Sequence, residues 1–317
     1  MKGILITGIG GDIAQGVATL VRESRPGVRI VGTDIHAEHG GSLFSDHCLT
    51  VPSARDASYG SALRDAVVRH GIELVMPMTE AEIPVIPAAL GDPPLARYVT
   101  PGPGAVAAGI DKLATAKMLQ GLCLNPPWTL AAAEAMPLSY PCILKPRFGS
   151  GSRGLLVINN ELEARCLANK YPQALFQEQL EPAHGEVTCA VYRTKDGEIG
   201  ILQLLRRLAG GLTGWATVIR DLSVERMCAK IAESVDLRGS INIQLKLTAL
   251  GPRIFEINSR FSSTVVMRHR LGFTDVVWTL DELDGRPVRL ARVSPGKTVA
   301  RVHGAAVLPD RQLKEKA

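Results

Sequence analysis

The chain has 317 residues, a formal net charge of +5, 46% hydrophobic residues and only 4% aromatic residues. This length exceeds the usual size of one compact core, so we expect two or three subdomains. No run of about twenty apolar residues occurs, which argues against a membrane partner. Basic residues are dispersed and aromatics are few, so nucleic acid is not expected as the main partner.

Two features of the sequence indicate a reducing compartment. The N-terminal segment enters a strand pattern at Gly3 and lacks the long apolar region of a signal peptide, so we expect a cytoplasmic protein. The 6 cysteines are scattered and form no Cys-x-x-Cys pair. We interpret them as structural thiols rather than as a zinc or redox site.

Residues 2 to about 100 alternate between strand-like and helix-like segments. This alternation predicts a Rossmann-like α/β domain with a parallel sheet. Pro-Gly-Pro-Gly at 101–104 then interrupts the pattern and marks the end of this first domain. The expected strands are 3–7, 28–34, 48–51 and 73–78, and the expected helices are 12–22 and 57–70.

The rest of the chain is richer in strands. A hairpin turn is expected at 195–198, and a second turn at 249–252 should join two antiparallel strands. Helices are expected at 111–120 and 223–235, and strands at 140–146, 155–158, 175–180, 186–193, 199–208 and 240–247. A further strand, which carries Glu256, should follow the turn at 249–252.

A first glycine cluster, Gly8 to Gly16, follows a predicted strand and precedes a predicted helix, with Asp34 ending the next strand. This is the context of a dinucleotide-binding loop, so a nicotinamide-dependent reductase or epimerase is one alternative. Such an enzyme also needs a Tyr-x-x-x-Lys pair, which is absent. The other alternative is a sheet that binds substrate through Gly10 and Gly11, or is vestigial.

A second glycine cluster follows Lys145, which ends a predicted strand. It leads into another strand rather than a helix, so it differs from a Walker loop and is typical of a flap that closes over phosphates. Lys145 would meet the phosphates as a compact charge. The plainer alternative is a flexible hairpin with a surface lysine. The glycine and serine residues of the flap are Gly149, Ser150, Gly151, Ser152 and Gly154.

Glu256, Asn258 and Arg260 share one face of a predicted strand, with Phe255 and Ile257 on the other face. A carboxylate and an amide oxygen at this spacing suit Mg²⁺, which prefers oxygen ligands and substrate phosphates. Antiparallel pairing about the turn at 249–252 would bring three further polar side chains alongside, namely Asn242, Gln244 and Lys246. A solvent-facing sheet is the alternative.

Two acidic residues and an arginine lie near the ends of other predicted strands. Glu178 could accept a proton from an adenine amino group, with the backbone of Gln179 and Leu180 pairing to the ring, and Glu186 could accept from ribose hydroxyls. Arg206, next to a mobile-looking glycine segment at 209–215, could hold an acyl phosphate or a substrate carboxylate. Arg206 and Arg207 must face opposite sides of their strand.

In this order, the residues resemble the ATP-grasp superfamily, in the branch similar to the carbamoyl phosphate synthetase large subunit and to stand-alone carboxylate-amine ligases. The resemblance covers nearly the whole chain. It implies an α/β domain at 1–104, followed by two α+β subdomains that grip ATP. We expect the small subdomain with the glycine flap at 105–174 and the large subdomain with the metal site at 175–317.

The resemblance also implies roles for individual residues. Ser259 stands where the family has proline, and Glu80 stands where it often has aspartate, so Glu82 in the same segment is only a candidate substrate contact. The implied roles are phosphate contacts from Lys112 and Lys145, adenine contacts from Glu178, Gln179 and Leu180, a ribose contact from Glu186, Mg²⁺ or Mn²⁺ ligands from Gln244, Glu256 and Asn258, and stabilisation of the transferred phosphoryl group by Arg260.

The leading hypothesis is therefore an ATP- and Mg²⁺-dependent ligase. It would activate a small-molecule carboxylate as an acyl phosphate for attack by an amine, with release of ADP and phosphate. The chain is too short for the duplicated synthetase, so carbamoyl phosphate synthesis itself is not expected. A homodimer is expected from the resemblance alone. A non-catalytic nucleotide-binding protein is the third alternative.

Overall fold

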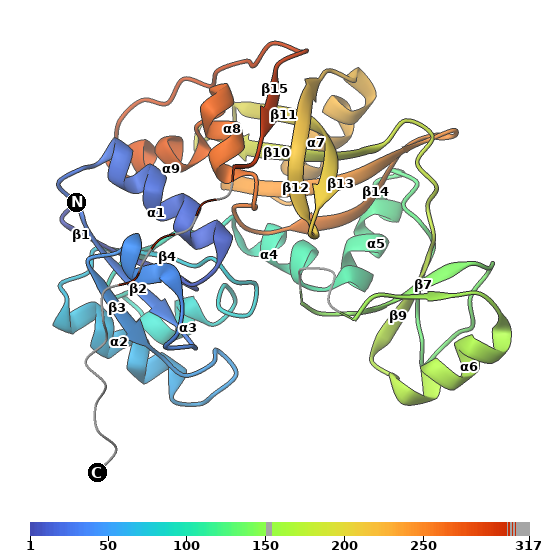
Figure 1. Cartoon of the computed structure of the whole chain (residues 1–317), viewed down its shortest axis with the longest axis horizontal. Coiled ribbons are helices and arrows are strands. Elements are labelled where there is room, and N and C mark those ends of the chain that lie inside the picture. Colours follow the sequence, from blue (N-terminus) through green and yellow to red (C-terminus); the bar gives the residue numbers. More distant parts are fainter. Residues whose placement is uncertain (150–153, 303, 305, 307, 309–317) are drawn as a thin grey trace.

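The computed structural model describes residues 1–149, 154–302, 304, 306 and 308. Three sheets form three lobes, with the first domain in blue and cyan, the small lobe in green and the large sheet in yellow and orange (Figure 1). Within the described residues, no helix combines the length and apolar character that crossing a membrane requires.

The first domain contains a parallel sheet, as predicted. It has five strands in the order β3-β2-β1-β4-β5, of which the edge strand β5 was not expected. Every residue of β1 is buried, because helices cover both faces of a parallel sheet. The elements are β1 Gly3–Thr7, α1 Asp12–Ser24, β2 Arg29–Asp34, the 3-10 helix η1 Gly40–Leu43, β3 His47–Thr50, α2 Tyr59–Arg69, β4 Leu74–Met76, α3 Ile86–Leu90 and β5 Arg97–Tyr98.

Two helices and a small four-stranded sheet follow. The sheet has the order β6-β9-β7-β8 with antiparallel pairs throughout. Because β9 pairs with β6 and β7, this lobe extends to Glu178, and the expected boundary after residue 174 falls inside β9. The elements are α4 Pro103–Ile110, α5 Lys112–Gly121, β6 Thr129–Ala131, β7 Cys142–Pro146, β8 Leu156–Ile158, α6 Glu161–Lys170 and β9 Ala174–Glu178.

The large sheet has six antiparallel strands in the order β14-β13-β10-β11-β12-β15. Helix α7 covers one face and is joined there by Ala105, Ala108 and Leu119 of α4 and α5. Helices α4 and α5, expected as part of the small subdomain, therefore pack on the large sheet, and α5 also contacts β6 of the small lobe. The elements are β10 Glu186–Arg193, β11 Ile199–Ala209, β12 Leu212–Ile219, α7 Leu222–Ser234, β13 Gly239–Thr248, β14 Gly251–Asn258, α8 Val265–Leu271, α9 Asp275–Leu283 and β15 Thr298–Ala300.

The segment at 209–215, expected as a mobile loop, is a tight hairpin between β11 and β12. Gly210 and Gly211 form its turn with φ values of 58° and 80°, a conformation that glycine adopts without a steric penalty. Ala209 pairs with Leu212 on either side of the turn. The two glycines thus provide the turn of a regular hairpin.

The first domain and the C-terminal helices share one core. Helix α1 contacts both α8 and α9 and lies beside them in Figure 1. Gly16 of α1 allows this approach, because a Cβ at that position would lie 2.9 Å from a side-chain atom of Val265. The shared core also contains Phe261, Val276 and Leu280.

Candidate active site

The strand pair β13–β14 carries the predicted metal residues. Asn242 pairs with Asn258 and Gln244 pairs with Glu256, which confirms the predicted register at these positions. A bulge after Gln244 then shifts the pairing. As a result, the expected alternation of side chains between the two faces of β14 is wrong for the residues before Glu256.

The bulge changes which side chains of β14 face the core. Ile254 and Ile257 both belong to the core of the large sheet, whereas Phe255 is only half-buried. Lys246 lies opposite Arg253 rather than beside Glu256, and its Nζ donates to the carbonyl of Leu180 at 2.8 Å. The polar face of the hairpin therefore consists of Asn242, Gln244, Glu256 and Asn258.

Arg206 lies on the neighbouring strands and links two of the predicted ligand-binding residues. It pairs with Glu186 across β10 and β11 and donates from Nη2 to Gln244 Oε1 at 2.9 Å. Arg207 faces the opposite side, as predicted. Its guanidinium lies over the ring of Trp215, with 5.5 Å between the guanidinium carbon and the ring centroid. Glu186, Arg206 and Gln244 thus form one hydrogen-bonded group on the site face of the sheet.

Lys145 is the residue before the last one of β7 and is 7% exposed. Its Nζ donates to Gln177 Oε1 at 2.7 Å and lies 3.5 Å from the carbonyl oxygen of Phe255, so it reaches from the small lobe to β14. Burial lowers the pKa of Lys145 to about 8, Lys112 adds to this effect, and the carboxylate of Glu256 opposes it. Lys145, Lys112 and Glu256 therefore act on one another electrostatically.

Lys112 opens α5 beside the second glycine cluster. Asp111 caps this helix by accepting from the backbone N–H of Leu113 at 2.9 Å. Arg147, the residue after β7, forms an ion pair with the same carboxylate at 2.6 Å. The Nζ of Lys112 donates to the carbonyl of Gly149. The predicted Ser150, Gly151 and Ser152 lie outside the described residues. Gly154 is described and has a φ of 74°.

Glu178 is already paired on both oxygens. Arg253 donates to Oε1 at 2.5 Å and to Oε2 at 2.7 Å, and the backbone N–H of Trp128 donates to Oε2 at 3.2 Å. Burial acts to raise the pKa of Glu178, but these donors outweigh it and hold the pKa below its usual value. Leu180, two residues further along the chain, is also buried. The Oε1 of Gln179 is buried and has no hydrogen-bond partner within the described residues.

Arg260 joins the large subdomain to the first domain. Its Nη2 lies 3.2 Å from Glu80 Oε1 and 3.2 Å from Asn258 Oδ1, and its Nη1 donates to the carbonyl of Phe261 at 3.1 Å. Burial raises the pKa of Glu80, Arg260 and Lys112 act to lower it, and Glu256 acts to raise it. Glu80 is thus a site residue that the sequence showed only as a departure from the family pattern.

The first glycine loop and Glu82 do not join this group. Glu82 is 6% exposed and accepts from Thr7 and Thr79 at 2.6 Å each and from Tyr59 at 3.0 Å. These three hydroxyls engage the carboxylate inside the first domain, and a substrate contact by Glu82 stays a prediction.

The backbone N–H groups of Gly10 and Gly11 already donate hydrogen bonds to groups of the same chain. The backbone N–H of Gly10 donates to Asp34 Oδ2 at 2.9 Å. The N–H of Gly11 donates to the carbonyl of Gly8, also at 2.9 Å. The Asp34 carboxylate therefore lies against the amide that would receive a phosphate in a dinucleotide site.

The donor set on β13 and β14 fits Mg²⁺ with a bound phosphate. Within the described residues the carboxylate of Glu256 has no hydrogen bond or ion pair, and no three His, Cys, Asp or Glu side chains form a metal cluster by themselves. The amide oxygens of Gln244 and Asn258 each accept one N–H from an arginine, which leaves a second lone pair. The buried amide nitrogens of Asn242 and Asn258 lack partners in the described part of the chain and could donate to an anion.

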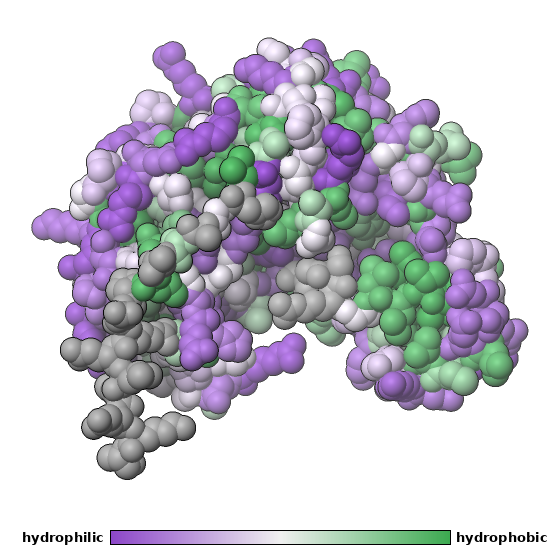
Figure 2. Space-filling model, viewed as in Figure 1, coloured by the Kyte–Doolittle hydropathy of each residue, from purple (hydrophilic) through white to green (hydrophobic). Residues whose placement is uncertain are grey.

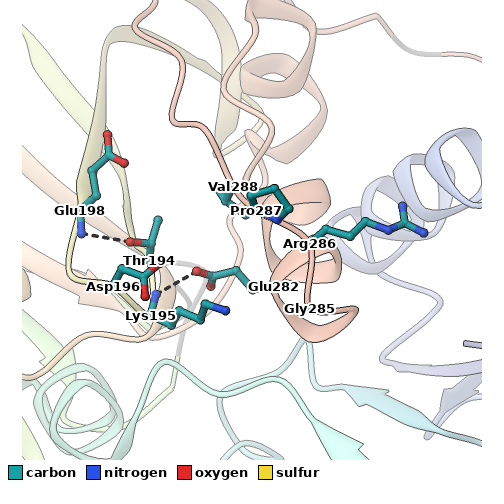
Figure 3. Close-up of a pocket in the computed structure, with 9 residues that line it drawn as sticks. All are labelled: Thr194, Lys195, Asp196, Glu198, Glu282, Gly285, Arg286, Pro287 and Val288. Carbon is teal, nitrogen blue, oxygen red and sulfur yellow. Dashed lines mark hydrogen bonds between the residues drawn. The ribbon is translucent and has the colours of Figure 1, made fainter.

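Figure 2 shows the molecule indented between the first domain and the small lobe. A separate cavity of about 260 Å³ lies between the β10–β11 turn and the end of α9, where Glu282 accepts from the backbone N–H of Lys195 at 2.8 Å (Figure 3). It adjoins Arg193, which is about 23 Å along β10 from Glu186 at about 3.3 Å per residue. This cavity is therefore not part of the site.

Comparison with known proteins decides the identity of the central region. A family model described as the ATP-grasp domain matches residues 110–264. This central region is therefore similar to the ATP-grasp domain family. The carbamoyl phosphate synthase large chain of Sulfurisphaera tokodaii is 28% identical over 150 residues, which are 42% of this chain and 14% of that protein. The chain thus matches about a seventh of this relative's length.

Solved structures extend the likeness beyond the ATP-grasp domain to most of the chain. The N5-carboxyaminoimidazole ribonucleotide synthetase of Thermus thermophilus is similar with a TM-score of 0.71 and 17% identity, over 93% of this chain and 81% of that one. The L-amino acid ligase of Bacillus licheniformis is similar with a TM-score of 0.70 and 16% identity, over 94% and 78%. At these identities the likeness is one of fold, and it includes the first domain.

A third similar structure has ligands bound. The biotin carboxylase domain of Hydrogenobacter thermophilus 2-oxoglutarate carboxylase, in complex with MgADP and bicarbonate, has a TM-score of 0.71 and 16% identity, over 94% of this chain and 73% of that one. The comparisons favour the ATP-grasp interpretation over a nicotinamide-dependent enzyme.

Sequence reasoning missed three residues that complete the site. Gln177 holds Lys145, Arg253 holds Glu178, and Glu80 pairs with Arg260. Gln177 had a visible signal, since it lies on the strand that pairs with β7, opposite Ile143, which is two residues from Lys145 on the same face. No local pattern connects Arg253 with a glutamate 75 residues earlier.

Proposed function

We propose that this protein is an ATP- and Mg²⁺-dependent ligase that joins a carboxylate to an amine through an acyl phosphate. The observation that carries the proposal is the convergence of Lys112, Lys145, Glu256 and Arg260 from three separate segments, namely the start of α5, β7 and the end of β14. The charges of Lys112, Lys145 and Glu256 act on one another, and Glu80 interacts with Lys112, Glu256 and Arg260. A cation-rich site with one unpaired carboxylate suits a nucleotide triphosphate with its metal.

In this proposal the cations of the site hold the phosphates. Lys145 and Lys112 contact the phosphates from the small lobe and from α5, together with Gly149, Gly154 and the segment between them. Arg260 donates to the transferred phosphoryl group as charge develops on its oxygens. Arg206 holds the carboxylate or the acyl phosphate. Bound Mg²⁺, held by Gln244, Glu256 and Asn258, would neutralise charge on the phosphate oxygens. Mn²⁺ could take the same place.

The nucleoside is assigned to the connection between β9 and β10. The backbone of Gln179 and Leu180 pairs with adenine, and Glu186 accepts from ribose. Glu178 can accept from the adenine amino group only through lone pairs that Arg253 and Trp128 leave free, so we assign it first to positioning the connection. Carboxylate and amine metabolites are the proposed substrates. A homodimer and formation of a C–N bond are parts of the same proposal.

The acyl phosphate requires exclusion of water, because water competes with the amine for the activated carboxyl carbon. Lys145 spans from the small lobe to β14 through Gln177 and the carbonyl of Phe255. It therefore keeps the two lobes in contact at the point where the phosphates are proposed to lie. The amine attacks the acyl carbon, phosphate leaves, and ADP and the new C–N bond are the products.

The test is an ADP-release screen over paired carboxylates and amines, with products identified by mass spectrometry. We expect one pair to give ADP, phosphate and a condensed product in equal amounts. Lys145→Ala and Glu256→Ala should lose nearly all ADP formation while remaining folded by circular dichroism. Full activity in both variants would refute the site.

A thermal-shift titration separates the alternatives. Stabilisation by ATP with Mg²⁺ but not by NAD(H) supports the ligase, and the reverse supports the reductase. Binding of ATP with no ADP formed from any pair would instead indicate a nucleotide-binding protein without catalysis.

A further inference from the structure

The ion pair between Glu80 and Arg260 crosses from the first domain to the large subdomain. Both side chains are nearly buried, with 8% and 10% of their surfaces exposed, and the closest N–O distance is 3.2 Å. Arg260 has two further acceptors, Asn258 Oδ1 and the carbonyl of Phe261. Three acceptors therefore fix the plane of one guanidinium.

Glu80 differs from its neighbour Glu82 in what it contacts. Glu82 accepts from three hydroxyls of the first domain, so its contacts stabilise that domain. Within the described residues Glu80 has no hydroxyl donor, and Arg260 is its ion-pair partner. A buried carboxylate requires a compensating partner, and here that partner belongs to the site.

Glu256 is a second carboxylate within electrostatic reach of this group, since its charge acts on Glu80 together with that of Arg260. Glu256 itself has no ion pair in the described part of the chain. Within the described residues Arg260 is thus paired with the carboxylate of Glu80 and not with that of Glu256. A guanidinium on Glu256 would occupy the oxygens that a metal needs.

We propose that Glu80 is a positioning residue that holds Arg260 away from Glu256, so that Glu256 stays available to a divalent cation and Arg260 stays aimed at the phosphates. This inference rests on the proposed function. It assigns the first domain a direct part in assembling the nucleotide site. The predicted effect of losing Glu80 acts through Arg260 and not through the stability of the first domain.

The test measures ATP binding to the full chain by calorimetry, with and without Mg²⁺. In Glu80→Gln we expect the factor by which Mg²⁺ tightens ATP binding to fall about 10-fold or more, as for other outer-shell partners of metal sites. The double variant Glu80→Gln/Arg260→Gln should regain most of that factor, because no guanidinium remains to cover Glu256. It should still form no ADP.

Restoration by the second substitution is a result that a merely structural Glu80 would not give. A Glu80→Gln variant with the wild-type Mg²⁺ factor, or a double variant that does not regain it, overturns the proposal. Should Glu80→Gln not fold, Glu80→Asp keeps the charge but is one methylene shorter. It should lower the factor in the same direction, and an unchanged factor would overturn the proposal.

Glu82→Gln is the matched control, two residues away and equally buried. We expect a lower Tm and an unchanged Mg²⁺ factor, and a reduced factor in this variant would overturn the specific role of Glu80. If Mg²⁺ does not tighten ATP binding in the wild type, the proposed function itself fails. If it does and Glu80→Gln behaves like the wild type, only the inference about Glu80 fails.

Discussion

Ser259 donates a hydrogen bond from its Oγ to the backbone carbonyl of Ala105 at 2.5 Å. This bond ties the end of β14 to α4, between the site residues Asn258 and Arg260. Ser259 is fully buried, and α4 approaches it closely at Gly109. Ser259 thus makes a hydrogen bond that a proline at this position could not make.

Gly109→Ala should disturb this contact. An added Cβ would lie 2.0 Å from Ser259 Oγ, so α4 or the end of β14 must move. We expect a loss of about 1 to 3 kcal/mol in the free energy of unfolding, typical of overpacking, together with reduced ADP formation. Urea unfolding and the ADP assay check this. Gly121→Ala, in α5 with no atom within 4 Å of the added Cβ, is the control and should not be destabilised. Equal stability of the two variants would contradict the prediction.

The pKa of Lys145, about 8, predicts how activity depends on pH. The protonated amine is the form that binds phosphate, so kcat/KM for ATP should decline as the pH rises through about 8. This parameter reports groups of the free enzyme. The pH profile of kcat/KM between 7 and 9 measures it, and a flat profile would count against a phosphate-binding Lys145.

The same pKa predicts a change in stability. Lysine in the unfolded chain has a pKa of about 10.4, so between pH 8 and that value the unfolded state binds more protons than the folded state. The contribution of Lys145 to the free energy of unfolding therefore increases with pH across this window. Urea unfolding of wild type and Lys145→Met at several pH values should show this increase in the wild type only.

Arg253→Met should weaken the connection to the small lobe. The guanidinium pairs with both oxygens of Glu178 and donates to the carbonyls of Asn125 and Pro126. We expect a loss of about 1.5 to 3 kcal/mol at pH 7, the range for hydrogen bonds to charged groups. The pKa of Glu178 is depressed, so the stability it provides is present above about pH 4.3 and is lost at lower pH. Urea unfolding should show a smaller difference between wild type and variant at pH 3, and an equal difference would refute the assignment.

Arg206→Gln and Arg207→Gln form a matched pair on one strand. Arg206 contacts Glu186 and Gln244 on the site face, whereas Arg207 is exposed and stacks on Trp215. We expect Arg206→Gln to lower ADP formation at least about 10-fold, corresponding to about 1.4 kcal/mol of transition-state stabilisation. Arg207→Gln should match the wild type in rate, and a comparable loss in both variants would exclude a specific role for Arg206.

The sequence was sufficient to predict the elements whose pattern is local. The parallel sheet of the first domain, β10 from Glu186 to Arg193 and the pairing of Gln244 with Glu256 all follow from runs of alternating or continuous apolar residues. The bulge after Gln244 was not predictable, because an extra residue in one strand leaves the alternation of the other intact. It moved Ile254 into the core and Phe255 out of it.

The remaining errors concern which distant segments meet. Glu80 and Glu82 are glutamates two residues apart in one segment, and the sequence does not distinguish them. In the structure Glu80 pairs with Arg260, whereas Glu82 accepts a hydrogen bond from Tyr59. Which carboxylate belongs to the site depends on the direction in which each side chain leaves the loop after β4. The ion pair between Arg253 and Glu178 likewise depends on the strand registers of two different sheets.

The core that α1 shares with α8 and α9 affects how the chain can be divided. Residues Phe261, Val265, Val276 and Leu280 bury their side chains against the first domain. A fragment beginning at residue 105 would expose all four to water, at a cost of about 1.5 to 3 kcal/mol for each large side chain left uncovered. The region from residue 105 onward is therefore not an independent folding unit. A chimaera that contains it must also contain α1, the helix that follows the first glycine loop.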